Sequence, residues 1–565
     1  MDPATDWVLP NPYDQVPYPG LSYTPTHPDR LATIAILMGM NPAPVEHCRV
    51  LELGCAVGGN LVPMAYGLPG SEFLGVDYSL RQVAEGQAAV AVLGLKNVTF
   101  KHLNILNMNR DVGQFDYIIA HGVYSWVPEV VRDKILVICK ENLAPNGVAY
   151  VSYNTYPGWN MIKIVRDMML YHTRKIVDPL ARASQARAVL DFFAKATASE
   201  NNAYSSFLQM YADVIAKRLD NVLGRDHVLV LHDEMEEVND PVYFYEFAER
   251  AQQHGLQYLG EADFSSMRGR TTAGSDVPRQ VTEGLCQMAG DLIELEQYVD
   301  FLNNRTFRRT LLCHQEIELP PQLTPDPVMA LFVASRAKPV AANPDIYSVS
   351  IEKFQTADGP AISTDHPTSK VALTCLAEKW PQALPFDVLL AQARARLEAH
   401  APADSGQGAA QAVNDIDVDA QVLAANLLTA YGYSNSLVEL RSYVPPFVPE
   451  VSERPVASAV ARFRAQSNNQ VTNLRHERVE VDGFERYLLR HLDGSRDRAA
   501  LLDLLMAGPV AEGLLTVQQD GKPAEGNGEI KALLAEELEE RLGWLARAAL
   551  LADPSTSGEK VDGCG

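Results

Sequence analysis

The chain has 565 residues, 47% of them hydrophobic, and a formal net charge of −23 from 71 acidic and 48 basic residues. This length is enough for several domains, each with its own buried core. The acidic excess argues against nucleic acid as a partner, because binding to a phosphate backbone draws its affinity from basic surfaces. No apolar stretch is long enough to span a membrane, and the start MDPATDWVLP lacks the pattern of a secretory signal. We therefore expect a cytoplasmic protein with reduced thiols, since the seven cysteines include no CxxC pair.

The segment before residue 41 is aromatic and rich in proline. Tyr13, Tyr18 and Tyr23 stand among the prolines, and Pro28 is placed for the first turn of a predicted helix. Such a stiff segment can act as a lid over a cofactor pocket or as a strap packed on a sheet. Both alternatives stay open at this point.

The run RVLELGCAVGGN is the most informative feature of the chain. Its first five residues indicate a buried strand, and the glycines that follow predict a tight bend into a helix. Gly54 and Gly58 have no Cβ, so a nucleoside ligand can approach the backbone closely. Glu52 places a carboxylate beside the bend, which suits a cofactor with an ammonium and a sulfonium. A dinucleotide fingerprint fitted on Gly54, Ala56 and Gly59 is the second alternative.

Four further strands alternate with helices after this bend. SEFLGVDYS predicts a strand ending in Asp77, at the spacing where an acid reaches ribose hydroxyls, or where it caps a helix. NVTFKHLNI ends at Asn104 and Ile105, where an amide oxygen can accept a hydrogen bond from the adenine amino group. FDYIIAHGV ends a fourth strand at His121, which could also be a core histidine, and GVAYVSYN follows the breaker run APNG as the fifth. The alternation predicts an α/β, Rossmann-like fold.

Residues 161–240 are predicted to be a helical insertion with a hydrophobic stripe. The stripe can pack within its own domain or against a second subunit in a homodimer. It consists of Leu180, Val189, Phe192, Phe193, Phe207, Leu208, Tyr211, Val214, Ile215 and Leu219. Two helix–strand pairs between residues 241 and 318 are predicted to supply the sixth and seventh strands of the sheet.

The stretch from Asp226 to Asp263 is strongly acidic. It holds ten acidic residues and one basic residue, Arg250. This pattern indicates either a solvated helix face or a docking surface for a basic polypeptide.

We divide the chain into five parts. These are a core with an N-terminal lid (1–160), the helical insertion (161–240), a regulatory segment that completes the sheet (241–318), a winged-helix-like domain (319–400) and a helical C-terminal domain (417–553). The two C-terminal parts are expected to be mixed α+β. APADSGQGAAQAV is predicted to be a linker, and the tail STSGEKVDGCG to be disordered.

Several strings resemble a known family of bacterial methyltransferases. They include LELGCAVGGN, FDYIIAHGVYSWVP, NTYPGW, HDEMEEVNDPVYFYEFAE and EQYVDFLNNRTFRRTLLC. They are similar to class I S-adenosylmethionine (SAM) methyltransferases with a methyltransferase regulatory domain, which include the rickettsial protein-lysine methyltransferases. The family motif acid-x-Gly-x-Gly-x-Gly corresponds to Glu52, Gly54, Ala56 and Gly58, with alanine at the middle glycine.

The resemblance implies a SAM site and a protein acceptor. Residues expected to hold the cofactor are Glu52, Gly54, Cys55, Ala56, Gly58, Asn60, Asp77, Tyr78, Gln82, Asn104, Ile105 and His121. Residues expected to line the acceptor channel as the catalytic set are Tyr124, Trp126, Tyr153 and Asn154, with core anchoring of Trp126 and Tyr153 as the structural alternative. No metal site is expected, because the chain has no HExxH motif.

Three functions fit these observations. The first is a methyltransferase acting on protein side chains, with lysine as the acceptor. The second is a small-molecule methyltransferase, and the third is a non-catalytic SAM-binding scaffold.

Overall fold

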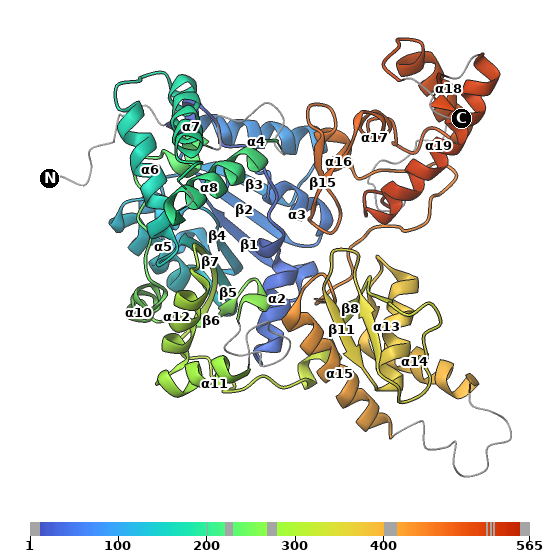
Figure 1. Cartoon of the computed structure of the whole chain (residues 1–565), viewed down its shortest axis with the longest axis horizontal. Helices are drawn as coiled ribbons and strands as arrows, with labels where there is room; N and C mark the ends of the chain where they lie inside the picture. Colours follow the sequence, from blue (N-terminus) through green and yellow to red (C-terminus); the bar gives the residue numbers. More distant parts are fainter. Residues whose placement is uncertain are drawn as a thin grey trace.

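The computed structural model describes residues 12–200, 202–220, 230–267, 279–400, 415–515, 518–519, 522–523 and 526–553. The helical insertion, a middle domain and a C-terminal unit surround one central sheet (Figure 1). The predicted linker APADSGQGAAQAV and the tail STSGEKVDGCG lie outside the described residues.

The central sheet has seven strands in the order β3-β2-β1-β4-β5-β7-β6. β1 to β5 are parallel, whereas β7 runs antiparallel to both β5 and β6. The strands are β1 (Arg49–Leu53), β2 (Glu72–Asp77), β3 (Val98–His102), β4 (Phe115–Ala120), β5 (Leu143–Asn154), β6 (Leu256–Glu261) and β7 (Phe307–His314). The predicted Rossmann-like fold with its sixth and seventh strands is therefore confirmed. The run at 144–147 was expected to break the chain, but it lies inside β5, where the pairing with β4 shifts between Phe115 and Tyr117.

Helices cover both faces of the sheet. On one face, α2 (Pro28–Leu37), α3 (Leu61–Gly67) and α4 (Leu80–Leu93) contribute to a core that includes Val50 and Ile119. On the other face, α5 (Glu129–Asn142) and α10 (Phe244–Gln253) share a core with Leu51 and Ile118. Because consecutive strand residues point to opposite faces, these two cores also separate the side chains at the ends of β4 and β5.

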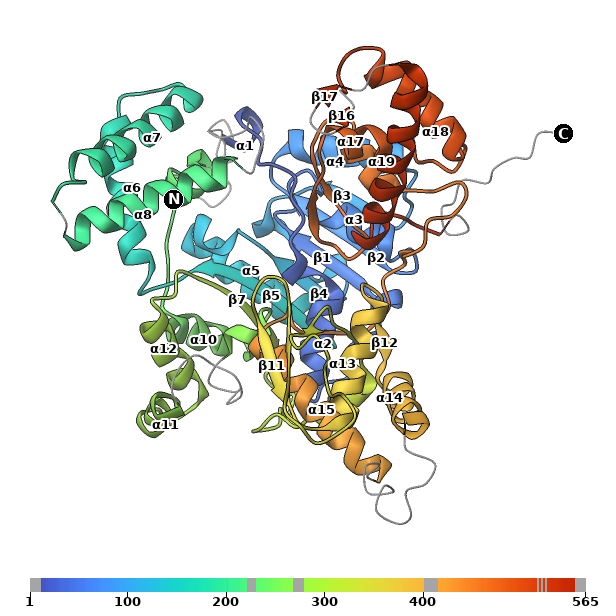
Figure 2. The same ribbon diagram turned by 45° about the vertical axis from the view of Figure 1, so that its right-hand side comes forward.

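The N-terminal segment 12–27, called the strap below, lies on the glycine-rich bend and the start of α4 (Figure 2). Ser79 Oγ donates to Asp14 Oδ1 at 2.5 Å, and Gln82 Nε2 donates to the Tyr18 carbonyl at 3.4 Å. The amide of Tyr23 donates to Asn60 Oδ1 at 3.0 Å. Segment 12–27 therefore runs along the carboxyl edge of the parallel strands. This position is compatible with both alternatives, a lid over the cofactor pocket and a segment packed on the sheet.

The helical insertion has a core of its own. It comprises α6 (Trp159–Thr173), α7 (Pro179–Ala196), α8 (Ala203–Asp220) and the π-helix η6 (Val230–Glu234). The predicted hydrophobic stripe is divided between two surroundings. Val189, Phe207, Leu208, Tyr211 and Ile215 are buried in the core of the insertion, whereas Leu180, Phe192, Phe193 and Val214 are exposed. The side chain of Leu219 lies outside the described part.

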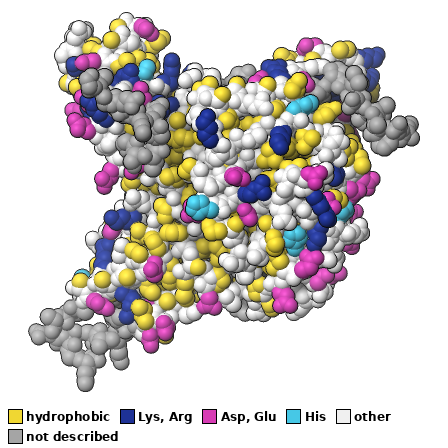
Figure 3. All heavy atoms as spheres, turned by 180° about the vertical axis from the view of Figure 1, so that it is seen from behind, with side chains coloured by type: hydrophobic (Ala, Val, Ile, Leu, Met, Phe, Trp, Pro, Cys, Tyr) yellow, Lys and Arg dark blue, Asp and Glu magenta, His cyan; other side chains and the backbone are white. Residues whose placement is uncertain are grey.

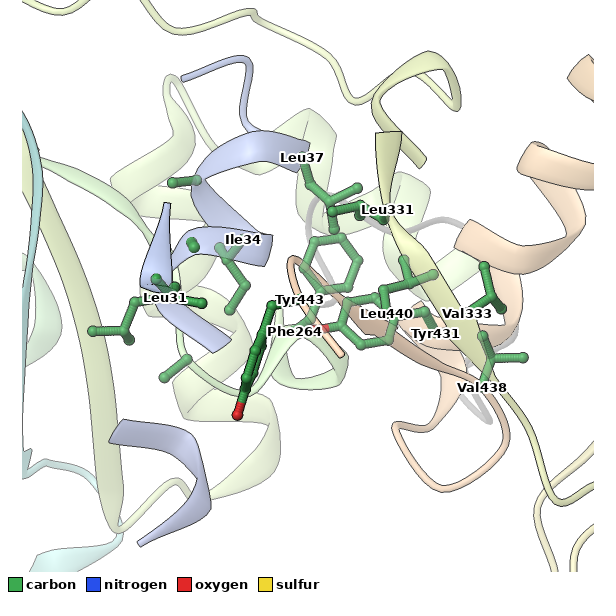
Figure 4. Packing of buried hydrophobic residues seen from close by; sticks show 14 of the residues in the cluster. Leu31, Ile34, Leu37, Phe264, Leu331, Val333, Tyr431, Val438, Leu440 and Tyr443 are labelled. Atoms are coloured by element: carbon green, nitrogen blue, oxygen red, sulfur yellow. The ribbon is translucent and has the colours of Figure 1, made fainter. Parts of the chain in front are cut away.

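The middle domain shares one continuous core with the catalytic sheet. Its elements are β8 (Phe332–Ala334), β9 (Lys338–Pro339), β10 (Glu352–Gln355), β11 (Ala361–Thr364), α13 (Pro367–Lys379), β12 (Leu384–Pro385), α14 (Phe386–His400), α15 (Ile416–Tyr433) and β13 (Glu439–Arg441). Figure 4 shows Ile34 and Leu37 of α2 beside Leu331, Phe264 and Tyr431. The middle domain is therefore packed onto the sheet through α2.

A separate hydrophobic core builds the C-terminal unit. Its larger elements are α16 (Ala459–Arg464), β14 (Gln470–Thr472), β15 (Arg478–Glu480), α17 (Gly483–Leu489), α18 (Arg498–Leu505) and α19 (Asn527–Arg547). This unit contacts the strap, because Thr24 Oγ1 donates to the His476 carbonyl at 2.9 Å and Thr472 Oγ1 donates to Ser22 Oγ at 3.1 Å. The strap is thus held between the cofactor edge of the sheet and the C-terminal unit.

Gly59→Ala is predicted to release the strap. A Cβ on Gly59 would lie 2.2 Å from the carbonyl carbon of Gly20, a backbone contact that cannot be relieved by a side-chain rotation. We expect destabilisation of about 1–3 kcal/mol, typical of overpacking, and faster chymotryptic cleavage after Tyr18 or Tyr23. Gly67→Ala is the matched control, because its Cβ would meet nothing within 4 Å. Equal cleavage rates in the two variants would contradict the prediction.

Candidate active site

Three residues of the glycine-rich bend adopt a left-handed backbone. Gly54, Ala56 and Gly58 have φ values of +72°, +47° and +74°. A Cβ on Gly54 would lie 2.5 Å from Val123 Cγ2, and one on Gly58 would lie 2.3 Å from Phe100 Cζ. Glycine is therefore required at both positions by the packing of the bend itself. Ala56 takes a conformation that favours glycine, which explains the middle glycine of the motif.

Asp77 fastens the bend to the end of β2. Its Oδ2 accepts from the amide of Ala56 at 2.8 Å, and its Oδ1 accepts from the amide of Ser79 at 2.8 Å. Ser79, rather than Asp77, caps α4. Because each carboxylate oxygen can accept a second hydrogen bond, Asp77 can still bind ribose hydroxyls.

Glu52 is a buried carboxylate with one unpaired oxygen. Asn60 Nδ2 donates to Oε1 at 2.7 Å, whereas Oε2 is buried with no hydrogen-bond partner among the residues that the structure describes. Burial raises the pKa of Glu52 to about 8, opposed by the Asn60 hydrogen bond and reinforced by the charge of Asp77. An unpaired acid of this kind fits the ammonium or sulfonium of SAM, because a nearby cation favours its charged form.

Asn60 connects Glu52 to the strap and to the C-terminal unit. Its Nδ2 also donates to Thr26 Oγ1 at 2.9 Å, and its Oδ1 lies 2.9 Å from His476 Nε2. Asn60 was predicted as a cofactor residue. In the structure the Asn60 amide contacts Glu52 directly, and through this hydrogen bond Asn60 orients the Glu52 carboxyl group.

The other predicted cofactor residues differ in their surroundings. Tyr78 is exposed, and its carbonyl lies 3.0 Å from His102 Nε2. Asn104 Oδ1 accepts from the amide of Leu106 at 2.9 Å, and it keeps a second lone pair for the predicted hydrogen bond from the adenine amino group. Gln82 is held by the strap as described above, Cys55 is buried beside the bend, and Ile105 is half-buried against the core of α5.

His121 stands at the end of β4 among aromatic rings and hydroxyls. Its Nδ1 lies 2.9 Å from the Tyr150 hydroxyl and 3.3 Å from Ser152 Oγ. The ring of Tyr23 lies against it, with centroids 3.9 Å apart. Burial lowers the pKa of His121 to about 3, with further lowering from Arg309 and Arg478, so its imidazole is neutral.

Tyr124 and Tyr153, two of the four predicted channel residues, lie together in the core under α5 and α10. Their ring centroids are 5.2 and 4.1 Å from that of Phe247. The Tyr153 hydroxyl lies 2.9 Å from Thr310 Oγ1, whereas the Tyr124 hydroxyl has no partner among the described residues. These surroundings favour core anchoring over a channel position.

The other two predicted channel residues lie in loop contacts. Trp126 is half-buried, and its ring meets that of Trp159 edge to face at 6.4 Å. Asn154 is buried, and its Nδ2 donates to Asn239 Oδ1 at 3.2 Å. The structure therefore does not bring the four residues into one group.

Sequence reasoning missed the set that does surround His121. It consists of Tyr23, Tyr150, Ser152, Phe307 and Arg309. The alternation along GVAYVSYN was an available signal, because it puts Tyr150 and Ser152 on one face of the strand and Tyr153 on the other. Tyr23 stands in the predicted lid or strap segment, but nothing local links it to His121. The β7 residues gave no local signal, since β5 and β7 are joined only in the folded sheet.

Arg309 of this set also lines a cavity of about 480 Å³, called the Arg309 cavity below. Its walls come from the N-terminal segment, from β7 and the residues after β6, from the middle domain and from the C-terminal unit. Among the described residues no group of three or more His, Cys, Asp or Glu side chains could hold a metal ion, and no helix is long and apolar enough to cross a bilayer.

The glycine-rich bend, the acids at the ends of β1 and β2 and the strand order define a class I methyltransferase that uses SAM. Residues 44–206 match a family model described as a methyltransferase domain, and residues 226–314 match a predicted methyltransferase regulatory domain. Residues 453–550 match a PKMT C-terminal winged helix domain, within the part predicted to be a helical C-terminal domain. The chain belongs to the family of bacterial SAM-dependent methyltransferases that carry this regulatory domain.

Two similar proteins extend over nearly the whole chain. The uncharacterised protein RP789 of Rickettsia prowazekii is 35% identical over 528 residues, covering 92% of this chain and 90% of that protein. The structure of PKMT2 from Rickettsia typhi in complex with AdoHcy superimposes with a TM-score of 0.80 at 29% identity, covering 95% of this chain and all of that one. A second R. prowazekii protein, RP028, is 39% identical over 247 residues, 44% of this chain and 96% of that protein.

Glu52→Gln tests the role of the buried acid in cofactor binding. Because the pKa of Glu52 is about 8 before a cation is present, SAM should bind with release of a proton at pH 7, and more tightly as the pH rises toward 8. Glutamine keeps the hydrogen bond from Asn60 but cannot ionise, so both effects should vanish and affinity should fall by about tenfold. Calorimetry in buffers of different ionisation enthalpy measures the proton release.

Glu72→Gln is the control for this experiment, because the Glu72 side chain is 75% exposed in a surface pair with Arg49. Its proton release and its affinity should equal those of the unmodified enzyme. SAM binding by the unmodified enzyme without proton release at pH 7 would show that Glu52 does not meet the cation.

Proposed function

We propose that the enzyme methylates lysine side chains of a protein substrate. The observation that carries this proposal is the Arg309 cavity, whose walls come from four separate parts of the chain. A small-molecule methyltransferase would need a closed pocket but not walls from two added C-terminal parts. The likeness to PKMT2 over nearly the whole chain, these parts included, supports the same proposal.

A lysine acceptor must lose a proton before it can attack the methyl group. At pH 7 this costs about 4.6 kcal/mol for an amine with an unperturbed pKa near 10.4. A dry surrounding lowers that cost, because it disfavours the ammonium. The rings of Tyr23 and Phe307 and the neutral imidazole of His121 supply such a surrounding. Alignment of the amine with the methyl–sulfur bond then supplies much of the rate.

The proposal is tested with SAM carrying a labelled methyl group and a bacterial lysate. We expect the label in protein, and acid hydrolysis should release it as methyllysine. The control is Glu52→Gln, which lowers labelling through the cofactor site without touching the acceptor. Label found only in metabolites would favour the small-molecule alternative, and no labelling despite SAM binding would favour the scaffold.

We further propose that a second copy of the chain covers α7 and α8. Phe192 and Met210 are 65% and 53% exposed, and Leu180, Phe193 and Tyr204 are exposed as well. Apolar patches of this kind are typical of protein interfaces. By contrast, two acids of the predicted docking stretch already have arginine partners, since Asp240 pairs with Arg132 and the buried Glu261 pairs with Arg308.

Phe192→Glu is predicted to separate the two copies, because it buries a charge in the apolar contact. Sedimentation velocity should show a dimer for the unmodified enzyme and a monomer for the variant. Val349→Glu is the matched control, since Val349 is 78% exposed on the middle domain. A monomeric unmodified enzyme would refute the homodimer.

A further inference from the structure

The Arg309 cavity is lined by more positive than negative charge. Five arginines and three acids line it, namely Arg30, Arg309, Arg336, Arg475 and Arg478 with Asp263, Glu439 and Glu477. This excess is unexpected in a chain with a net charge of −23.

Two of these arginines have carboxylate partners of their own. Arg336 Nη2 lies 3.0 Å from Asp358 Oδ2, and Arg475 binds both Glu439 and Glu477. Arg30 donates to the neutral hydroxyl of Tyr431 at 2.9 Å.

Arg309 and Arg478 have no carboxylate within ion-pair distance in the described part of the chain. Each lies against an aromatic ring instead. The Arg478 guanidinium is 5.9 Å from the ring centroid of Tyr23, and that of Arg309 is 5.4 Å from the ring centroid of Phe307. Both rings contact His121, so each guanidinium is separated from His121 by one ring.

We propose that Arg309 and Arg478 form an anion subsite that binds a carboxylate of the methyl acceptor, supplied by an acidic side chain near the target lysine. This inference rests on the proposed protein-lysine acceptor. A guanidinium recognises a carboxylate through two parallel hydrogen bonds, and stacking on a ring fixes its plane in advance. The two arginines come from β7 and β15, so the subsite exists only when the C-terminal unit is docked on the sheet.

The field of the two charges reaches the end of β4, because both lower the pKa of His121. The same field repels an incoming lysine ammonium. A carboxylate bound by the two guanidinium groups offsets this repulsion, so an acidic flank favours binding of the acceptor.

The surroundings favour a carboxylate over a nucleic-acid phosphate backbone. Three acids line the cavity itself, and on the face drawn in Figure 3 the Lys and Arg side chains of the described residues lie among Asp and Glu. A phosphate backbone needs a longer basic surface.

The test compares matched synthetic peptides with a central lysine, in which glutamate or glutamine occupies each neighbouring position in turn. Binding to the full-length enzyme saturated with AdoHcy is measured by fluorescence anisotropy. We expect at least one glutamate peptide to bind on the order of tenfold more tightly than its glutamine partner. Arg309→Gln and Arg478→Gln should each remove this preference. Arg478 is exposed, so its variant should fold normally.

Arg110→Gln is the control, because Arg110 pairs with Glu141 on the surface. Its replacement lowers the net charge by the same amount as Arg309→Gln or Arg478→Gln. It should keep the preference. Equal binding of the glutamate and glutamine peptides, or no binding of either, would overturn the subsite. The proposal would also be overturned by a competition experiment in which a short single-stranded RNA displaces the labelled glutamate peptide at a lower concentration than the unlabelled glutamate peptide does.

The source of the carboxylate is settled by the same variants. Loss of SAM affinity in Arg309→Gln and Arg478→Gln, with the peptide preference intact, would assign the two arginines to the carboxylate of SAM and overturn the proposal. Turnover of the bound peptides is measured separately. A glutamate preference that depends on the arginines, without methylation of the lysine, would support the subsite and refute the lysine acceptor.

Discussion

The amide of Asn60 joins three segments of the chain that are far apart in sequence. It donates to the buried carboxylate of Glu52, bonds to Thr26 and Tyr23 of the strap, and meets His476 of the C-terminal unit. Because an amide cannot carry a charge, it orients the Glu52 carboxyl group without forming an ion pair with it. The second oxygen of Glu52 therefore stays available for a cation, and a movement of this carboxyl group would also move the strap and the C-terminal unit, because Asn60 bonds to both.

A second buried group, a network of ion pairs around Arg308, connects β6 and β7 at the antiparallel end of the sheet. The Arg308 guanidinium on β7 binds Glu261 of β6 together with Glu296 and Asp300 of α12 (Leu292–Asn303). Burial raises the pKa of Glu296 and of Asp300, against the lowering by Arg308 and by Arg305, whose Nε lies 2.7 Å from Asp300 Oδ1. The strand that carries Arg308 also carries Arg309, which faces the cavity. The buried network thus fixes the position of one half of the anion subsite.

Features encoded within a few residues could be predicted from the sequence, and those built from distant segments could not. The bend at Gly54 and Gly58, the acid Asp77 and the alternation of strands and helices all depend on local spacing. Asn60 could be assigned to the site, but not its contact with His476, which lies 416 residues away. At the end of β5 the sequence could not tell which face lies beside His121. Tyr153 was therefore assigned to the predicted channel, although Ser152 is the residue that lies next to His121.

This division has a physical reason in the way the fold is assembled. A nucleotide-binding bend needs only one strand, one turn and one helix, so its residues are close together in the sequence. The acceptor side instead needs walls from β7, the strap, the middle domain and β15, which meet only at the carboxyl edge of the folded sheet. Substitutions in any of these segments can change what enters the cavity while leaving Glu52 and Asp77 untouched. Related chains can therefore keep one cofactor site and accept different substrates, and the part that distinguishes them is the part that local sequence patterns do not reveal.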